Sequence, residues 1–441
     1  MQKRLEQIKQ ELFHSEDLKV RPFMLDGETA NLIYIETLCD AAKLETSVFK
    51  QWFLARSRAE REFNIDDLLT AASVQKINDV QDAVKSLLQG KGLIGFVNSE
   101  ELYAFNAEQS NVRSIQEPVN ERSIVGERAG FVEHLSVNLN LIRNRASSSF
   151  VKVRYLTVGK HKSHKVAIIW LEGVAEESVV HETIERLSDF QSSMEVHPGK
   201  LQRQLVARRS IFPLVYSTER VDTTSTLLMQ GRVAILTDQS STCLIVPASF
   251  YTFMRTIDSL LLGPQISQLL HFLRMIGLML SLYACSLYIA TTMFHHEVLP
   301  AKMTINIKSS LENVPYPPII EAIIMIIVFQ LIAEATIRLP SQLAQMVGVA
   351  GGIIISESLV KVGFVSNVFI VIIAISMIGS FIIPTYQMRI FALMVQLMLL
   401  LGASLLGFYG IVFVTAGVLI HFFTLEPFGI PYCLPIRSNA K

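Results

Sequence analysis

The stretch Ser341–Val362, SQLAQMVGVAGGIIISESLVKV, decides how the second half of this chain is interpreted. In a helix, Ala344, Gly348, Gly352 and Ser356 would lie four residues apart along one face. This small-xxx-small spacing lets membrane helices bring their backbones close together. At 1.5 Å per residue the stretch would extend for about 33 Å, which is enough to cross a bilayer. We therefore predict a membrane helix that packs through its small face.

The same stretch is more polar than a helix that faces only lipid, because it also contains Gln345, Glu357 and Lys361. Glu357 and Lys361 are four residues apart and can form an ion pair in the last turns of the helix. Small residues on one face and polar residues on another suit an oligomeric pore. Tight packing inside a single chain explains the same composition, so both interpretations stay open.

Charge divides the chain into two parts. Residues 1–265 carry 64 of the 78 Lys, Arg, Asp and Glu side chains, whereas residues 266–425 carry only 11. The first part is predicted to be soluble and the second to lie in membrane lipid. The net charge is zero, which argues against nucleic acid as a partner, because binding to phosphates needs a basic surface.

The charged part is predicted to form two small α/β subdomains, at residues 1–118 and 119–262, with Pro118 near the boundary. Turn-forming pairs such as Asp26-Gly27 join predicted strands, and apolar residues recur at helical spacing between them. The predicted strands are Lys19–Leu25, Asn31–Thr37, Leu93–Val97, Glu101–Phe105, Val151–Val158, Val166–Leu171, Val233–Leu236 and Cys243–Pro247. The predicted helices are residues 1–16, Glu45–Arg58, Val80–Gln89, Phe131–Arg145 and Ser178–Leu187.

The apolar part, residues 266–425, contains five hydrophobic runs: Leu270–Met293, Ile319–Leu339, Ser341–Val362, Val365–Ile383 and Phe391–Phe423. The last run has 33 residues, which is too long for one crossing, and Gly407 and Gly410 are the natural places to split it. This division predicts six crossings, or five if Ser341–Val362 does not span. The N-terminus has no apolar signal region, so both subdomains and the tail, residues 426–441, are expected in the cytosol. The predicted class is α+β, with a cytosolic α/β region followed by an all-α polytopic membrane domain.

Three ionisable residues, Glu321, Glu334 and Arg338, fall in or at the end of the second hydrophobic run. A charge at membrane depth is costly unless it is paired or faces water, so such residues are functional candidates. Glu334 and Arg338 are four residues apart and can pair along the helix. Glu321 follows Pro318 closely, so its side chain could instead reach the membrane surface.

Catalytic and metal-binding signatures are missing from the sequence. It contains no GxSxG and no HExxH motif, and its four cysteines (Cys39, Cys243, Cys285 and Cys433) show no metal-ligand spacing. We therefore expect no enzyme activity, no cofactor and no metal, and we interpret the cysteines as buried free thiols.

Short motifs in a fixed order resemble the A subunits of the spore germinant receptors, the GerA family, from about residue 117 to 435. The motifs are Glu127–Arg145 (ERAGFVEHLSVNLNLIRNR), Val166–Gly173 (VAIIWLEG), Leu311–Pro317 (LENVPYP), Ala335–Pro340 (ATIRLP), Gln345–Gly352 (QMVGVAGG), Ser380–Tyr386 (SFIIPTY) and Phe428–Tyr432 (FGIPY). The chain departs from the family at Ser356-Glu357, where a Gly-Gln pair is usual, and it ends without a basic tail.

The resemblance implies a multi-pass protein of the inner membrane of a bacterial spore. Such subunits work with a transporter-like B subunit that senses a nutrient and with a lipoprotein C subunit. They are thought to form a homo-oligomeric ring that conducts monovalent ions when nutrient binds. A non-conducting scaffold or accessory paralogue that clusters germination proteins is the alternative. A stand-alone transporter is disfavoured, because no internal repeat of broken helices is visible.

Overall fold

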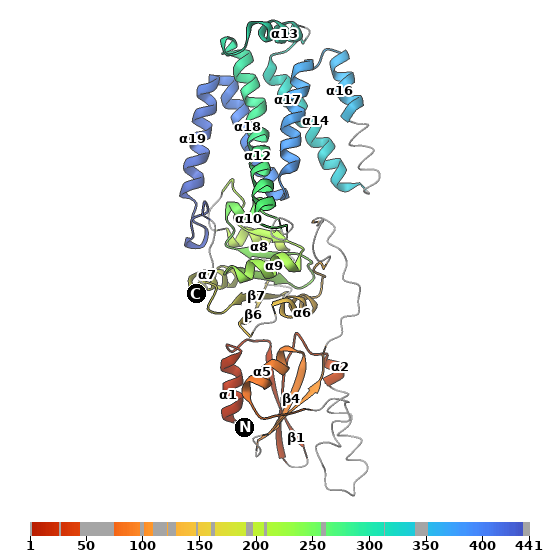
Figure 1. Ribbon diagram of the computed structural model, residues 1–441, viewed down its shortest axis with the longest axis vertical. Coiled ribbons are helices and arrows are strands. Elements are labelled where there is room, and N and C mark those ends of the chain that lie inside the picture. The colour runs from red at the N-terminus through yellow and green to blue at the C-terminus, as the bar shows by residue number, and fades with distance from the viewer. Residues whose placement is uncertain are drawn as a thin grey trace.

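The computed structural model is elongated, with two sheet-containing subdomains stacked below a bundle of long helices (Figure 1). It describes residues 2–25, 28–44, 75–97, 101–108, 121, 129–146, 149–159, 164–190, 197–206, 210–256, 262–312, 314–339 and 352–434. The predicted helix Glu45–Arg58 and the first half of the stretch Ser341–Val362, up to residue 351, lie outside these residues.

The first subdomain is a five-stranded antiparallel sheet in the order β1-β2-β4-β5-β3. Strand β2 alternates between two apolar layers: Ile33 and Ile35 face the helices α1 and α5, whereas Leu32 and Tyr34 contribute to the other face. The elements are α1 (Gln2–Glu11), β1 (Leu18–Leu25), β2 (Glu28–Ile35), α2 (Ala41–Leu44), β3 (Gln75–Ile77), α5 (Val80–Leu88), β4 (Lys91–Phe96) and β5 (Leu102–Asn106).

The second subdomain repeats this plan with the strand order β6-β7-β9-β10-β8. Its interior strand β7 is buried on both faces: Ile168 and Trp170 pack toward α7 and α8, and Ala167 and Ile169 toward α6 and α9. The elements are α6 (Leu135–Ala146), β6 (Val151–Val158), β7 (His164–Leu171), α7 (Glu177–Ser188), α8 (Pro198–Leu205), β8 (Tyr216–Thr218), α9 (Val221–Met229), β9 (Val233–Thr237), β10 (Cys243–Val246) and α10 (Phe250–Met254).

These two sheets, followed by helices, confirm the predicted α+β class. Two helix ends differ most from the prediction: α1 ends at Glu11 and not at residue 16, and α6 begins at Leu135 and not at Phe131. The Phe131 amide instead donates to the Glu219 carbonyl at 2.8 Å, and Gly130 forms a bridge with Arg220. These residues are therefore extended along the edge of the second sheet.

The helical part is centred on α12, which packs against α17 and α18, while α18 also packs against α19. Within the described residues, α12, α14 and α18 are long and apolar enough to cross a membrane, and α17 and α19 are shorter apolar helices. The bounds are α12 (Pro264–Met293), α13 (Ala301–Leu311), α14 (Pro318–Arg338), α16 (Gly352–Lys361), α17 (Asn367–Ile382), α18 (Tyr386–Leu406) and α19 (Phe408–Thr424).

The long last hydrophobic run is broken at Gly407, as predicted, and the break separates α18 from α19. Gly407 has a φ of +62°, a conformation that glycine adopts without strain. The connection between α12 and α14 contains the short helix α13 at the end of the bundle far from the sheets (Figure 1).

After α19 the chain returns to the second subdomain. The Tyr432 carbonyl accepts a hydrogen bond from the Phe250 amide at 3.1 Å, and Phe428 joins the apolar layer under α7. The Arg186 guanidinium lies 4.3 Å from the centre of the Phe428 ring. The last described residues thus lie on the same side of the helix bundle as both sheets (Figure 1).

Candidate functional site

Helix α14 carries the three ionisable residues singled out in the sequence. Pro318 stands in its first turn, where the missing N–H of proline costs nothing, and the helix ends at Arg338 before Leu339. The helix runs from the far end of the bundle toward the sheets (Figure 1). Glu321 therefore lies near the far end and Glu334 near the sheets, about 20 Å apart at 1.5 Å per residue, so they cannot form one carboxylate pair within a chain.

Glu321 is completely buried, with 0% of the residue exposed. Its Oε1 atom accepts a hydrogen bond of 2.5 Å from the backbone amide of Ser366, the residue that caps α17. The Ser366 hydroxyl in turn accepts from the Phe369 amide at 3.2 Å and lies 3.3 Å from the Tyr288 hydroxyl. The carboxylate thus sits at the N-terminus of α17, where the helix dipole favours a negative charge.

This arrangement joins three helices at one point, because Tyr288 belongs to α12, Glu321 to α14 and Ser366 to the start of α17. The carboxylate does not extend to the membrane surface, which was the alternative considered from its position near Pro318. Its second oxygen, Oε2, is buried and has no hydrogen-bond partner among the described residues. Glu321 therefore contributes to packing between helices and keeps one unused acceptor.

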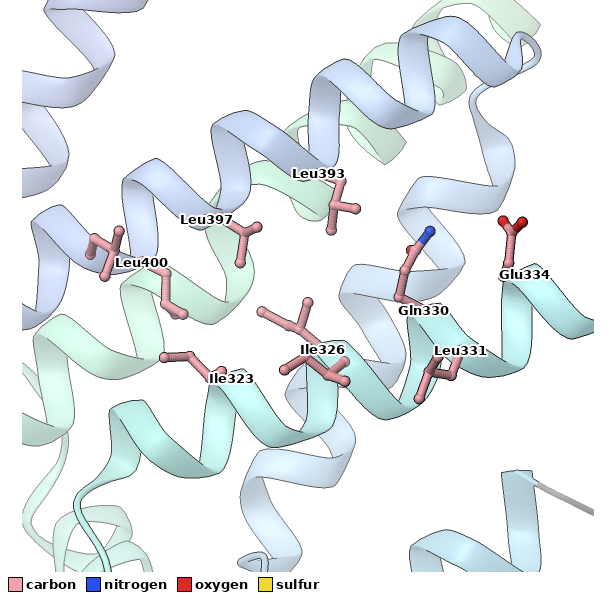
Figure 2. Close-up of a pocket in the computed structure, with 10 residues that line it drawn as sticks. Ile323, Ile326, Gln330, Leu331, Glu334, Leu393, Leu397 and Leu400 are labelled. Atoms are coloured by element: carbon pink, nitrogen blue, oxygen red, sulfur yellow. The ribbon is translucent and has the colours of Figure 1, made fainter.

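Glu334 and Gln330 lie at one end of a groove of about 510 Å³ between α14 and α18 (Figure 2). The remaining lining is apolar and comes from both helices. Figure 2 shows Leu393 and Leu397 facing Ile326 across the groove, with Gln330 and Glu334 beyond Ile326. The groove is thus apolar over most of its length and polar at the end that contains Gln330 and Glu334. Its lining residues are Ile323, Ile326, Ile327, Gln330, Leu331, Glu334, Leu393, Leu397, Leu400 and Leu401.

Part of the small-residue stretch can be placed. Gly352 begins the described part of α16, and a Cβ atom added there would have no neighbour within 4 Å among the described residues. Glu357 and Lys361 form an ion pair of 2.6 Å with side chains 61% and 73% exposed, which is worth little for stability. Ala344, Gln345 and Gly348, and the side chains of Ser356 and Arg338, lie outside what the structure describes.

A second small-residue face, which was not predicted from the sequence, makes a close helix contact within the described residues. A Cβ atom on Gly379 of α17 would lie 2.5 Å from the Gly277 carbonyl of α12, and one on Gly277 would lie 3.1 Å from the Gly379 carbonyl. Gly277, Ser281 and Cys285 follow one another at four-residue spacing. The signal that pointed to Ser341–Val362 was therefore present in the first hydrophobic run as well.

Buried polar side chains strengthen the same contact. The Ser376 hydroxyl of α17 donates to the Ser281 carbonyl of α12 at 3.1 Å, and the Gln396 amide of α18 donates to the Ser376 oxygen at 3.0 Å. The residues Ser281, Ser376 and Gln396 are each at most 4% exposed. Polar contacts of this kind hold membrane helices together where lipid offers no partner.

No group of three or more His, Cys, Asp or Glu side chains in the described part of the chain could hold a metal ion. The four cysteines are free; Cys39, Cys243 and Cys285 are buried and Cys433 is partly exposed. Burial raises the pKa of the Cys39 and Cys243 thiols to about 12. The candidate site therefore consists of the contacts between the helices and of two separated carboxylates, Glu321 and Glu334.

Comparison with known proteins adds the following. The chain matches the family described as Bacillus/Clostridium GerA spore germination protein over residues 6–441. It is 30% identical to spore germination protein B1 of Bacillus subtilis (strain 168), with 100% of this chain and 92% of that protein covered. Spore germination protein A1 of the same organism is 29% identical, with 96% and 88% covered. The crystal structure of the N-terminal domain of the A subunit of the Bacillus megaterium spore germinant receptor GerK3 has 21% identity, a TM-score of 0.42, and covers 56% of this chain and 94% of that one.

Proposed function

The chain belongs to the GerA family of spore germination proteins, and from this premise we propose that it is a membrane subunit of a nutrient-germinant receptor complex that triggers spore germination. In this proposal the chain assembles into a ring that releases ions when a nutrient binds elsewhere in the complex. The chain performs no catalytic step. The observation that carries the proposal is the match with germination proteins over nearly the whole length, sheets and helices together.

The weak cover over α14 leaves an apolar face that another chain or lipid can cover. In α14, 22% of the most apolar stretch is buried, against 44% in α12. Ile327 and Leu331 of α14 are 53% and 64% exposed. A helix this open in one chain gains contacts when another helix or lipid covers it.

The pore part of the proposal rests on the stretch Ser341–Val362. Gly348 and Gly352 would bring neighbouring helices close, and Gln345 and Glu357 would supply oxygen atoms to monovalent ions. The exposed Glu357–Lys361 pair supports a polar face on this helix, because both side chains are free to meet water. Glu321 is assigned no ion contact, because it is completely buried between the helices of one chain.

The proposed partners are a transporter-like B subunit and a lipoprotein C subunit, and the proposed location is the inner membrane of the spore. The two subdomains and the last described residues lie on one side of the helices. In the proposed orientation that side is the cytosol.

The test reconstitutes the purified full-length chain in potassium-loaded liposomes, alone and together with the proposed B and C subunits. Particle mass gives the assembly size, and potassium release is followed while mixtures of amino acids, sugars and nucleosides are added. We expect an assembly larger than one chain and nutrient-dependent release in the complete complex. An assembled complex that passes no ions under any mixture would instead indicate a scaffold that clusters germination proteins.

A further inference from the structure

The groove between α14 and α18 has the shape and polarity of a site for one lipid chain. Eight of its ten lining residues are Ile or Leu, and the two polar ones, Gln330 and Glu334, stand together at one end (Figure 2). Its volume, about 510 Å³, lies within the range of ligand-binding sites. The groove therefore suits an elongated apolar ligand with a polar group at one end.

The length of the groove distinguishes between possible occupants. From Ile323 to Glu334 the lining on α14 covers eleven residue steps, or about 16 Å of helix axis. The hydrocarbon core of a bilayer is about 30 Å thick. One leaflet, and therefore one acyl chain, spans about half of that thickness, which matches the length of the groove. A membrane-spanning helix of a second subunit needs about 20 residues and 30 Å, so it would extend well beyond both ends of the groove.

The position of the polar end indicates from which leaflet the chain would enter. Gln330 and Glu334 lie in the half of α14 that is closer to the two sheets (Figure 1). Among the lining residues, Ile327, Leu331 and Leu401 are each more than half exposed, so the groove is open sideways to the bilayer. A lipid can thus enter without any helix moving apart.

We propose that this groove binds one acyl chain of a phospholipid from the leaflet that faces the two subdomains, with the ester region of the lipid beside Gln330. A bound chain would fill the space between α14 and α18 and keep these helices at their observed distance. This site is independent of ion conduction by the protein, so it can be tested without a germination assay.

The test uses the full-length chain in nanodiscs that contain a phospholipid with a diazirine at the end of one acyl chain. After illumination, cross-linked peptides are identified by mass spectrometry. We expect adducts concentrated on the groove residues of α14 and α18. The variant Leu397→Trp places a large ring in the groove and should lower these adducts at least fivefold.

The matched control is Leu405→Trp on the same helix. Leu405 is 74% exposed and does not line the groove, so adducts on the groove residues should stay at the wild-type level. If Leu397→Trp is poorly folded, as judged by its elution volume and thermal transition, Leu393→Phe takes its place. Adducts spread evenly over all exposed helices, or unchanged in the groove variant, would overturn the proposal. Cross-links between two copies through the groove in place of lipid adducts would overturn it as well.

Discussion

The Arg143 guanidinium donates two hydrogen bonds of 2.7 Å to the Asp17 carboxylate, across 126 residues of sequence. Asp17 precedes the first strand of the first subdomain and Arg143 belongs to α6 of the second. Their side chains are 0% and 3% exposed. This bidentate pair is therefore a buried link between the two subdomains.

Neighbouring groups complete the link. The hydroxyls of Ser15 and Thr37 donate to the two Asp17 oxygens at 2.6 and 3.0 Å. The Asn140 amide donates to the Thr37 carbonyl at 3.0 Å. Because Asp17 receives hydrogen bonds from every side, its negative charge is well compensated, and removing the carboxylate would leave the Arg143 charge buried without its partner.

We predict that Asp17→Ala destabilises the contact between the subdomains by about 3–5 kcal/mol, the usual result of removing one partner of a buried pair. The variant should unfold at a lower temperature and become sensitive to proteases between the subdomains. The control is Glu36→Gln, because the exposed Lys19–Glu36 pair at 3.7 Å contributes at most about 1 kcal/mol. Equal thermal transitions of Asp17→Ala and the wild type would contradict a stabilising role.

We also predict that Glu321→Ala lowers stability by about 1–3 kcal/mol, because the amide of Ser366 would lose its buried acceptor. Glu321→Gln keeps one acceptor oxygen and should lose less, which separates the hydrogen bond from the charge. Thermal unfolding in detergent measures both. The exposed Glu357→Gln is the control and should not shift the transition. A larger loss in Glu321→Gln than in Glu321→Ala would contradict this explanation.

The hydrogen-bond partners of Glu321 and Asp17 could not be predicted from the sequence. The position of Glu321 in a hydrophobic run marked it as important, and its partner Ser366 is 45 residues away. No local pattern identifies such a partner, because the pairing depends on how separate helices pack. Asp17 and Arg143 were not singled out for the same reason: both look like ordinary charged residues of a soluble domain.

The elements themselves were easier to predict, because they depend on local signals. The alternation in the strands and the glycine break at Gly407 are encoded within a few residues, and eight of the ten strands and the split after α18 were predicted. The two short edge strands β3 and β8 were not predicted. The spacing of a small-residue face is visible within a few residues of sequence, but the helix against which that face packs is not. Gly277, Ser281 and Cys285 show the same spacing as Gly348 and Gly352, and only the structure shows that the first set contacts α17.

Cysteine labelling tests the burial pattern. At neutral pH a thiol with a pKa of about 12, as for Cys39 and Cys243, is ionised in roughly one molecule in 10⁵ and reacts slowly. We therefore expect a membrane-impermeant maleimide to label the folded protein mainly at Cys433, which is partly exposed. Denaturation should make all four cysteines reactive. Rapid labelling of Cys39 or Cys243 in the native protein would contradict the described burial.

The two glycine faces should respond in opposite ways to added bulk. At Gly379 a Cβ atom would lie 2.5 Å from the backbone of α12. Overpacking a core usually costs about 1–3 kcal/mol, and Gly379→Leu should destabilise the chain by more than that. At Gly352 a side chain meets none of the described residues within 4 Å, and replacing a helical glycine gains up to about 1 kcal/mol of helix propensity. Gly352→Leu should thus keep its thermal transition at the wild-type value or above it.

The effect of Gly352→Leu should appear in assembly instead. If the small face of Ser341–Val362 packs against another copy, leucine at Gly352 separates the helices and shifts the particle mass toward the single chain. The control is Gly417→Leu on α19, where an added side chain also has open space and where no contact between copies is proposed. Particle mass in nanodiscs measures both variants. A wild-type assembly in Gly352→Leu, or equal loss of assembly in both variants, would show that Gly352 is not part of an interface between copies.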